Sequence, residues 1–177
     1  PKNDPRSYRP FTILPVLARV FERIVAGQLQ SFCDSSHIFP VEQFGFRKNP
    51  SCELALLAAT DSWYSSVDSG NFVGTLLIDL SKAFDSIPHR LLLAELQRMN
   101  CSVDVMQWFC SYLSDRQQRI VSCDGVTPWK TISRGVPQGS SLSPLLFNVF
   151  VRDLPRQTSS STLQFADDVS LSESHQS

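Results

Sequence analysis

Apolar residues recur three or four positions apart over the first third of the chain. The stripe from Leu17 to Phe32 leaves Glu22 and the neighbouring arginines on the other side, which predicts a helix packed on a core. A second helix is expected to end near Val67. Asn49 is its predicted cap, with Pro50 at the first position, because these residues suit a helix start.

The middle of the chain combines short apolar runs with turn residues. The run from Phe72 to Leu80 is too short for a separate helix and predicts a strand buried on both faces. Helices are expected after Pro88 and from about Val103 to Leu113. Two short runs flank Asp124-Gly125, a pair that favours a β-hairpin.

The last part of the chain alternates between glycine-rich, apolar and polar segments. The loop Gly135 to Gly139 precedes an apolar segment, and Ser143 is the expected cap of a buried helix. Leu163 to Ala166 predicts a short strand that runs directly into two aspartates. The residues from Ser170 to Ser177 form a polar run, for which the sequence predicts no element.

The composition leaves several classes of protein open. The 177 residues, 42% of them hydrophobic, suffice for one packed core. A net charge of -1 neither argues for nucleic acid as a partner nor excludes it. Five cysteines in no zinc-binding spacing indicate free thiols in a reducing compartment. We therefore expect an intracellular protein, nuclear or cytoplasmic, and no apolar run is long enough for a membrane span.

Three carboxylates follow the two predicted strands. Leu76-Leu77-Ile78 runs into Asp79, and the second strand runs into Asp167 and Asp168. Taken singly, an aspartate at a strand end is usually a turn former or a helix cap. If the two strands pair, all three carboxylates converge, and such neighbours need a cation to offset their repulsion. Clusters of oxygen ligands suit Mg²⁺, and two such ions are typical of in-line attack on phosphorus.

An aromatic side chain follows the first of these carboxylates. Phe84 lies five residues after Asp79, where its ring could sit under the sugar of a nucleotide and clash with a 2′-hydroxyl. The alternative is that Phe84 belongs to the apolar core. We expect the ring to project toward the cavity above Asp79. Asp85 is interpreted as structural, a cap for the helix that Pro88 opens.

The segment from Gly135 to Pro144 is rich in residues that expose backbone atoms. Its two glycines permit close approach of a ligand, and Gln138 can both donate and accept hydrogen bonds. An ordinary loop before a helix has a similar composition. This segment alone therefore leaves a binding role and a connecting role open.

Five segments of the chain resemble motifs of non-LTR, LINE-type reverse transcriptases. In chain order they are Tyr8-Arg9-Pro10-Phe11-Thr12-Ile13-Leu14-Pro15-Val16, Gln43-Phe44-Gly45-Phe46-Arg47, Leu77-Ile78-Asp79-Leu80-Ser81-Lys82-Ala83-Phe84-Asp85, Gly135-Val136-Pro137-Gln138-Gly139 with Ser143-Pro144-Leu145-Leu146-Phe147-Asn148, and Phe165-Ala166-Asp167-Asp168. The match extends from Tyr8 to Val169, over 162 of the 177 residues. Each motif alone has limited specificity, but five in the family's order are highly specific.

The resemblance implies an RNA-directed DNA polymerase with an α+β, right-hand architecture. Residues 1–71 would form a fingers-like region, and residues 72–177 the palm, an antiparallel sheet packed on helices. The chain begins at Pro1 and ends nine residues after Asp168. We therefore expect a fragment of a longer protein, with an incomplete palm and without the thumb. The isolated fragment is expected to bind primer–template weakly and to extend it negligibly.

The resemblance also implies a set of site residues. Asp79, Asp167 and Asp168 would be catalytic and would bind two Mg²⁺ ions, for which Mn²⁺ could substitute. The nucleotide-binding residues would be Leu80 through its carbonyl, Phe84 as the sugar-selecting gate, Gln138, Gly139, Arg9, Arg47 and Lys48. The partners would be an RNA template, a DNA primer and dNTPs, with no membrane. The oligomeric state stays open.

Three alternatives accompany this interpretation. A group II intron or retron-like reverse transcriptase would share the chemistry, and the flanking domains would decide. A non-catalytic nucleic-acid-binding remnant would be favoured by loss of an aspartate, and all three are present. A viral RNA polymerase has to admit the 2′-hydroxyl that a ring at Phe84 would exclude. We also expect Asp79 and at least one of Asp167 and Asp168 to lie close enough to share one metal ion.

Overall fold

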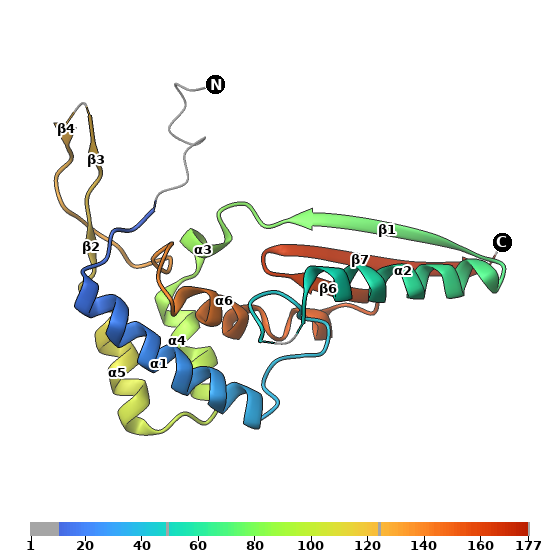
Figure 1. The fold of residues 1–177 in the computed structure, drawn as a ribbon, viewed down its shortest axis with the longest axis horizontal. Coiled ribbons are helices and arrows are strands. Elements are labelled where there is room, and N and C mark those ends of the chain that lie inside the picture. The colour runs from blue at the N-terminus through green and yellow to red at the C-terminus, as the bar shows by residue number, and fades with distance from the viewer. Residues whose placement is uncertain (1–10, 49, 124, 177) are drawn as a thin grey trace.

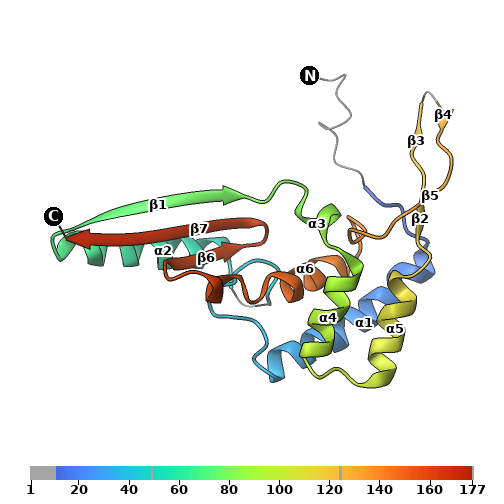
Figure 2. The ribbon, with the colours of Figure 1, turned by 180° about the vertical axis from the view of Figure 1, so that it is seen from behind.

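A long antiparallel sheet lies beside a group of packed helices in this computed structural model, which describes residues 11–48, 50–123 and 125–176 (Figures 1 and 2). The helices are α1 (Val16–Ser35), α2 (Cys52–Asp68), α3 (Ala83–Ser86), α4 (His89–Arg98), α5 (Val103–Leu113), α6 (Ser143–Val151) and the 3-10 helix η2 (Leu154–Gln157). The strands are β1 (Asn71–Asp79), β2 (Gln117–Gln118), β3 (Val121–Ser122), β4 (Gly125–Val126), β5 (Lys130–Thr131), β6 (Ser161–Phe165) and β7 (Asp168–Gln176). The expected mixture of helices and antiparallel strands is confirmed.

The three-stranded sheet has the order β1-β7-β6, with both pairs antiparallel. The two strands predicted from the sequence, β1 and β6, therefore do not pair directly, because β7 lies between them. This central strand consists largely of the polar run at the end of the chain, where the sequence predicted no element. Its polar side chains suit the position: Ser172 of β7 accepts a hydrogen bond from Trp63 of α2 at 3.0 Å.

The prediction that β1 is buried on both faces is wrong. Phe72, Leu76 and Leu77 are 70%, 59% and 76% exposed. The reason is its position, because β1 is an edge strand that, among the described residues, pairs only with β7. Helix α2 runs along one face of the sheet (Figure 1). An apolar run is typical of a buried strand, but the pattern does not say which neighbours will cover it.

Two predicted helix starts differ from the observed ones. The residue that caps α2 is Ser51, whose hydroxyl accepts the amide of Leu54 at 3.3 Å. Pro50 thus precedes the cap instead of opening the helix, and Asn49 lies outside the described residues. Helix α6 begins at Ser143, but the Ser143 hydroxyl donates to the carbonyl of Pro137 at 2.8 Å and does not cap the helix. The bounds predicted for α5 are confirmed.

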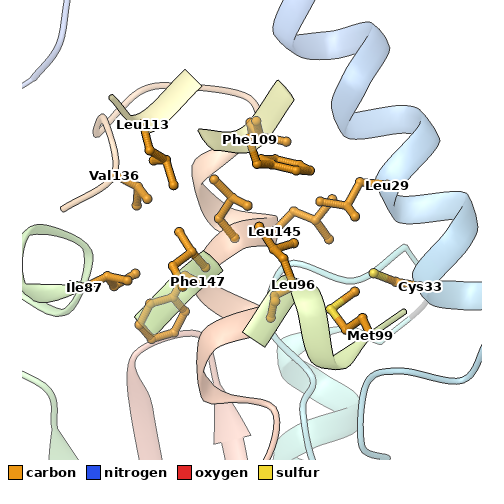
Figure 3. Close-up of a cluster of buried hydrophobic side chains, with 14 of the residues drawn as sticks. Leu29, Cys33, Ile87, Leu96, Met99, Phe109, Leu113, Val136, Leu145 and Phe147 are labelled. Atoms are coloured by element: carbon orange, nitrogen blue, oxygen red, sulfur yellow. The ribbon is translucent and has the colours of Figure 1, made fainter. Parts of the chain in front are cut away.

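The hydrophobic core lies among α1, α4, α5 and α6 (Figure 3). Its central side chains include Leu96 of α4, Phe109 of α5 and Phe147 of α6, all at most 1% exposed. Helix α1 contributes mainly its second half, through residues such as Leu29. In its first two turns, apolar side chains point to solvent, and Leu17 is 84% exposed. The predicted stripe of α1 therefore packs on the core only in part.

The predicted hairpin around Gly125 is confirmed, although Asp124 itself lies outside the described residues. It consists of two short antiparallel ladders, β2 with β5 and β3 with β4, and it extends away from the helices (Figures 1 and 2). In the part of the chain that the structure describes, no helix is long and apolar enough to cross a membrane. The division of the chain into two regions at residue 71 stays a prediction.

Candidate active site

The aspartates of the two acidic motifs meet at one end of the sheet. Asp79 is the last residue of β1 and Asp168 the first residue of β7, and the two are directly opposed in the antiparallel register. Directly opposed side chains lie on the same face of a sheet, with Cβ atoms about 4.5–5.5 Å apart. Asp167 precedes Asp168 in the turn from β6. Both motifs thus reach one place although Asp79 and Asp168 lie 89 positions apart in the sequence.

The turn between β6 and β7 contains two residues, Ala166 and Asp167, since Phe165 pairs with Asp168. Ala166 has a φ of 58°, which residues other than glycine rarely adopt. The amide of Leu80 donates to the carbonyl of Asp167 at 3.3 Å. This bond joins the turn to the chain just beyond β1, so the backbone connects the two acidic motifs directly.

The loop of residues 42–45, from the first part of the chain, packs against this turn. Two backbone hydrogen bonds of 2.8 Å join Gln164 of β6 to the loop 42–45. A Cβ atom at Gly45 would lie 2.7 Å from the Cα of Ala166, so only glycine fits there without moving the turn. The buried amide of Asn148 on α6 donates to the Gly45 carbonyl at 2.9 Å. Both residues lie in the quoted motifs, but the sequence did not predict that they support the acidic turn.

The carboxylate oxygens at this site are ligands of the kind that a hard divalent cation prefers. Asp79 and Asp168 offer only oxygen atoms, the ligands that Mg²⁺ prefers. Like charges directly opposed across a sheet are destabilising, and a bound cation would relieve that repulsion. Among the described residues, however, no group of three or more acidic, cysteine or histidine side chains lies close enough to hold an ion. The opposed register and the donor chemistry suit a shared metal ion, but both the predicted sharing and the ligand set stay predictions.

Leu80 directly follows Asp79, and Phe84 lies in α3, five residues after Asp79. The Leu80 carbonyl accepts the amide of Ala83 at 3.1 Å, which leaves one of its two lone pairs for another partner. The half-buried ring of Phe84 stacks on Phe147 of the core at 4.8 Å between centroids. Its other neighbour is Phe46, in an edge contact at 5.8 Å. Phe84 thus packs on the core on one side, and its role as a gate stays a prediction.

The glycine-rich loop lies against the segment that follows Phe84. The amide of Val136 donates to the Phe84 carbonyl at 2.9 Å, and the amide of Gly135 to the Ile87 carbonyl at 2.8 Å. The half-buried side chain of Gln138 donates to the carboxylate of Asp85 at 2.9 Å. The interpretation of Asp85 as a helix cap is wrong, since Pro88 precedes α4 and no side chain caps that helix. Asp85 instead holds the candidate nucleotide-binding glutamine.

Gly139 is exposed and has a φ of 93°, a conformation that suits glycine. The segment near Phe11 crosses it: a Cβ atom at Gly139 would lie 2.5 Å from the Phe11 ring. The amide of Thr12 also donates to the carbonyl of Gln138 at 2.9 Å. The first and fourth motifs of the resemblance therefore lie in contact.

The three cations predicted for nucleotide binding have different surroundings. Arg9 lies outside the described residues. The guanidinium of Arg47 donates to the carbonyls of Pro40 and Gln43, at 3.1 and 3.3 Å, and so it holds its own loop together. Lys48 is exposed. Their contacts with a nucleotide stay predictions.

An antiparallel sheet that presents paired aspartates at one end, with a helix along its face, is the palm arrangement that the resemblance implies. The whole chain, residues 1–177, matches the family described as reverse transcriptase (RNA-dependent DNA polymerase). The chain therefore belongs to the reverse transcriptase family, as the motifs predicted.

The relatives of the chain include polymerases of mobile elements. It is 30% identical over 174 residues to the probable RNA-directed DNA polymerase from transposon X-element of Drosophila melanogaster. This match covers 96% of this chain and 19% of that protein. It is 32% identical over 155 residues to the polymerase from transposon BS of the same organism, covering 88% and 17%. The chain thus spans about a fifth of the length of these relatives. The predicted LINE-type kinship is confirmed.

Solved telomerase structures have a similar fold. The telomerase of Candida tropicalis, in complex with a TWJ fragment of telomeric RNA, matches with a TM-score of 0.60 at 13% identity, over 90% of this chain and 29% of that one. The telomerase of Candida albicans in a similar complex matches with a TM-score of 0.57 at 15% identity, over 89% and 30%. At these identities the likeness shows the fold alone, and it confirms the expected reverse transcriptase fold.

Proposed function

We propose that this chain carries the nucleotidyl-transfer site of an RNA-directed DNA polymerase from a non-LTR retrotransposon. Its substrates would be a dNTP and the 3′-hydroxyl of a DNA primer, with RNA as the template. The observation that carries the proposal is the opposed register of Asp79 and Asp168, with Asp167 beside them in the turn. The family of the chain supports the type of reaction.

In this proposal Asp79, Asp167 and Asp168 hold two divalent cations, Mg²⁺ or Mn²⁺. When bound, these ions lower the pKa of the primer hydroxyl and offset the charge of the triphosphate and the leaving pyrophosphate. The chain itself orients the reactants, because phosphoryl transfer depends mainly on positioning and electrostatic stabilisation. The free lone pair of the Leu80 carbonyl supplies a further oxygen beside the carboxylates.

The nucleotide would lie between the acidic turn and the glycine-rich loop. Gln138 and the exposed Gly139 would contact the base pair and the sugar, with Arg9, Arg47 and Lys48 directed to the triphosphate or the template. Phe84 would select deoxyribose, because a ring beside the sugar excludes a 2′-hydroxyl. Its position between Phe46 and Phe147 supports this role, since both neighbours limit its movement.

The free cysteines of the chain support an intracellular location, in the nucleus or the cytoplasm. The test of the proposed function is primer extension on an RNA template by a polypeptide that extends this chain to the length of its relatives. We expect extension that requires Mg²⁺ and dNTPs and that is lost in Asp79→Asn. Binding of primer–template without any extension would favour the non-catalytic alternative.

A further inference from the structure

The loop that carries Gln138 and Gly139 is held by two carboxylates that the proposed chemistry does not use. Asp85, in α3, accepts the Gln138 amide at 2.9 Å. Ser140, two residues after Gln138, donates its hydroxyl to Glu22 of α1 at 2.7 Å. The loop is therefore fixed on both sides of Gly139, by residues that lie far apart in the sequence.

Glu22 is a buried carboxylate, only 3% exposed. Its second oxygen accepts the hydroxyl of Tyr112 on α5 at 2.7 Å. Burial raises the pKa of the Tyr112 hydroxyl, which therefore remains a hydrogen-bond donor at any physiological pH. A buried carboxylate is costly unless hydrogen bonds compensate it. No ion pair recorded among the described residues includes Glu22, so these two hydroxyls stabilise it there.

Ser140 connects Glu22 to the geometry of the loop. Its hydroxyl accepts the amide of Leu142 at 3.1 Å while it donates to Glu22. Its own amide donates to the carbonyl of Pro137 at 3.0 Å, and Ser140 is 5% exposed. A residue held by three hydrogen bonds has one position, and that position determines where the adjacent Gly139 and Gln138 lie.

We propose that Glu22 is a positioning residue for the incoming nucleotide, acting through Ser140 on the Gln138–Gly139 segment. This inference rests on the proposed function. Glu22 is buried, so it would act through Ser140 and not on the nucleotide itself. Loss of its bond to Ser140 releases the loop and weakens nucleotide binding, while the acidic turn and its metal ligands stay in place. The other oxygen of the Glu22 carboxylate accepts the Tyr112 hydroxyl, which joins Glu22 to α5.

The two hydroxyl partners of Glu22 allow a matched comparison. Ser140→Ala removes the contact of Glu22 with the loop, together with the bond from the Leu142 amide. Tyr112→Phe removes the contact of Glu22 with α5. Glu22→Leu removes both, whereas Glu22→Gln keeps an oxygen and a nitrogen that can pair with the two hydroxyls. All four variants would be assayed in a polypeptide extended to the length of the relatives, with thermal unfolding measured alongside.

Primer extension on an RNA template gives the KM for dNTP and kcat of each variant. We expect Ser140→Ala and Glu22→Leu to raise the KM about tenfold, the effect of one hydrogen bond to a charged group, with a smaller change in kcat. A further variant that combines Glu22→Leu with Ser140→Ala should raise the KM by less than the product of the two single effects, because both substitutions remove the bond between Glu22 and Ser140. Glu22→Gln should restore most of the loss. Tyr112→Phe should lower the melting temperature and leave the KM within about twofold of the unsubstituted protein.

The outcomes separate this inference from the proposed function. If the unsubstituted polypeptide extends no primer, the proposed function is overturned and this inference with it. If it extends primer but Ser140→Ala leaves the KM unchanged, only this inference is overturned. A Tyr112→Phe variant that raises the KM as much as Ser140→Ala also overturns it, because Glu22 would then be a general stability residue. Should Glu22→Leu fail to fold, the comparison of Ser140→Ala with Tyr112→Phe decides.

Discussion

Replacing Gly45 by alanine is expected to disturb the turn that carries the catalytic aspartates. A Cβ atom at position 45 would lie 2.7 Å from the Cα of Ala166 and 3.0 Å from the carbonyl carbon of Phe165, and closer still to the Ala166 amide nitrogen. These are backbone atoms, so no side-chain rotation relieves the contact. Ala166 already has a φ of 58°, and a left-handed alanine has little freedom to move further.

The expected loss of stability in Gly45→Ala follows from two opposing contributions to the free energy of unfolding. Adding a methyl group to a packed site typically costs about 1–3 kcal/mol of stability. Because the added methyl of Gly45→Ala would meet backbone atoms, we expect a cost in the upper half of that range, about 2–3 kcal/mol. The smaller entropy of the unfolded alanine chain offsets only about 0.4–1 kcal/mol. For a chain of this size, we expect a melting temperature roughly 2–10 °C lower. If the turn shifts by about 1 Å, primer extension should fall roughly a hundredfold.

The assay compares Gly45→Ala with Gly74→Ala. Gly74 lies in β1 of the same sheet, and a Cβ atom there would have no neighbour within 4 Å. Thermal unfolding of each chain measures the stability, and primer extension in the extended polypeptide measures the effect on the aspartates. If Gly45→Ala matches Gly74→Ala in both measurements, the loop does not support the acidic turn, and the reasoning from this close approach is wrong.

Three further predictions concern stability, sugar selection and pH. Asp168→Asn removes one of two opposed like charges, so it should stabilise the metal-free chain by roughly 0.2–1 kcal/mol in urea unfolding and abolish extension; a less stable variant would contradict this. Phe84→Val loses the stacking on Phe147, at a cost of about 1–3 kcal/mol, and should raise ribonucleotide incorporation; unchanged discrimination would leave Phe84 as core alone. Burial raises the pKa of the Cys33 thiol from its ordinary value of 9.0 to about 12, so its contribution to stability should be complete below pH 9 and lost as the pH rises toward 12. Cys33→Ala should flatten that part of the unfolding profile, and an unaltered profile would refute the assignment.

Local patterns in the sequence predicted most helices, because their signals lie within a few residues. Helix α5 appears with its predicted bounds, and α4 begins after Pro88 as expected. Strand β7 was missed because its residues are mostly polar, and nothing local favours a strand. It forms because β1 supplies pairing partners along its whole length and β6 pairs with its first five residues. That information lies in the neighbouring strands and not in the segment itself.

The sequence predicted the three aspartates of the acidic site but not the residues that hold the surrounding loops in place. The three aspartates carry a recognisable pattern, and the structure brings Asp79 and Asp168 into register. Glu22 gave no such signal, because a glutamate off an apolar stripe is normally exposed. Its burial depends on two hydroxyls, Ser140 and Tyr112, that lie about a hundred residues away. A single sequence does not show which distant hydroxyls will compensate a buried charge.

The proposed function requires that the aspartates at the end of the sheet catalyse DNA synthesis on RNA. The most direct measurement is primer extension on an RNA template by the extended polypeptide, with Asp167→Asn compared to Asp61→Asn. Asp61 is an exposed residue of α2 and carries the same change of charge. The account predicts Mg²⁺-dependent extension that Asp61→Asn leaves intact and Asp167→Asn abolishes. Extension that survives Asp167→Asn would contradict it.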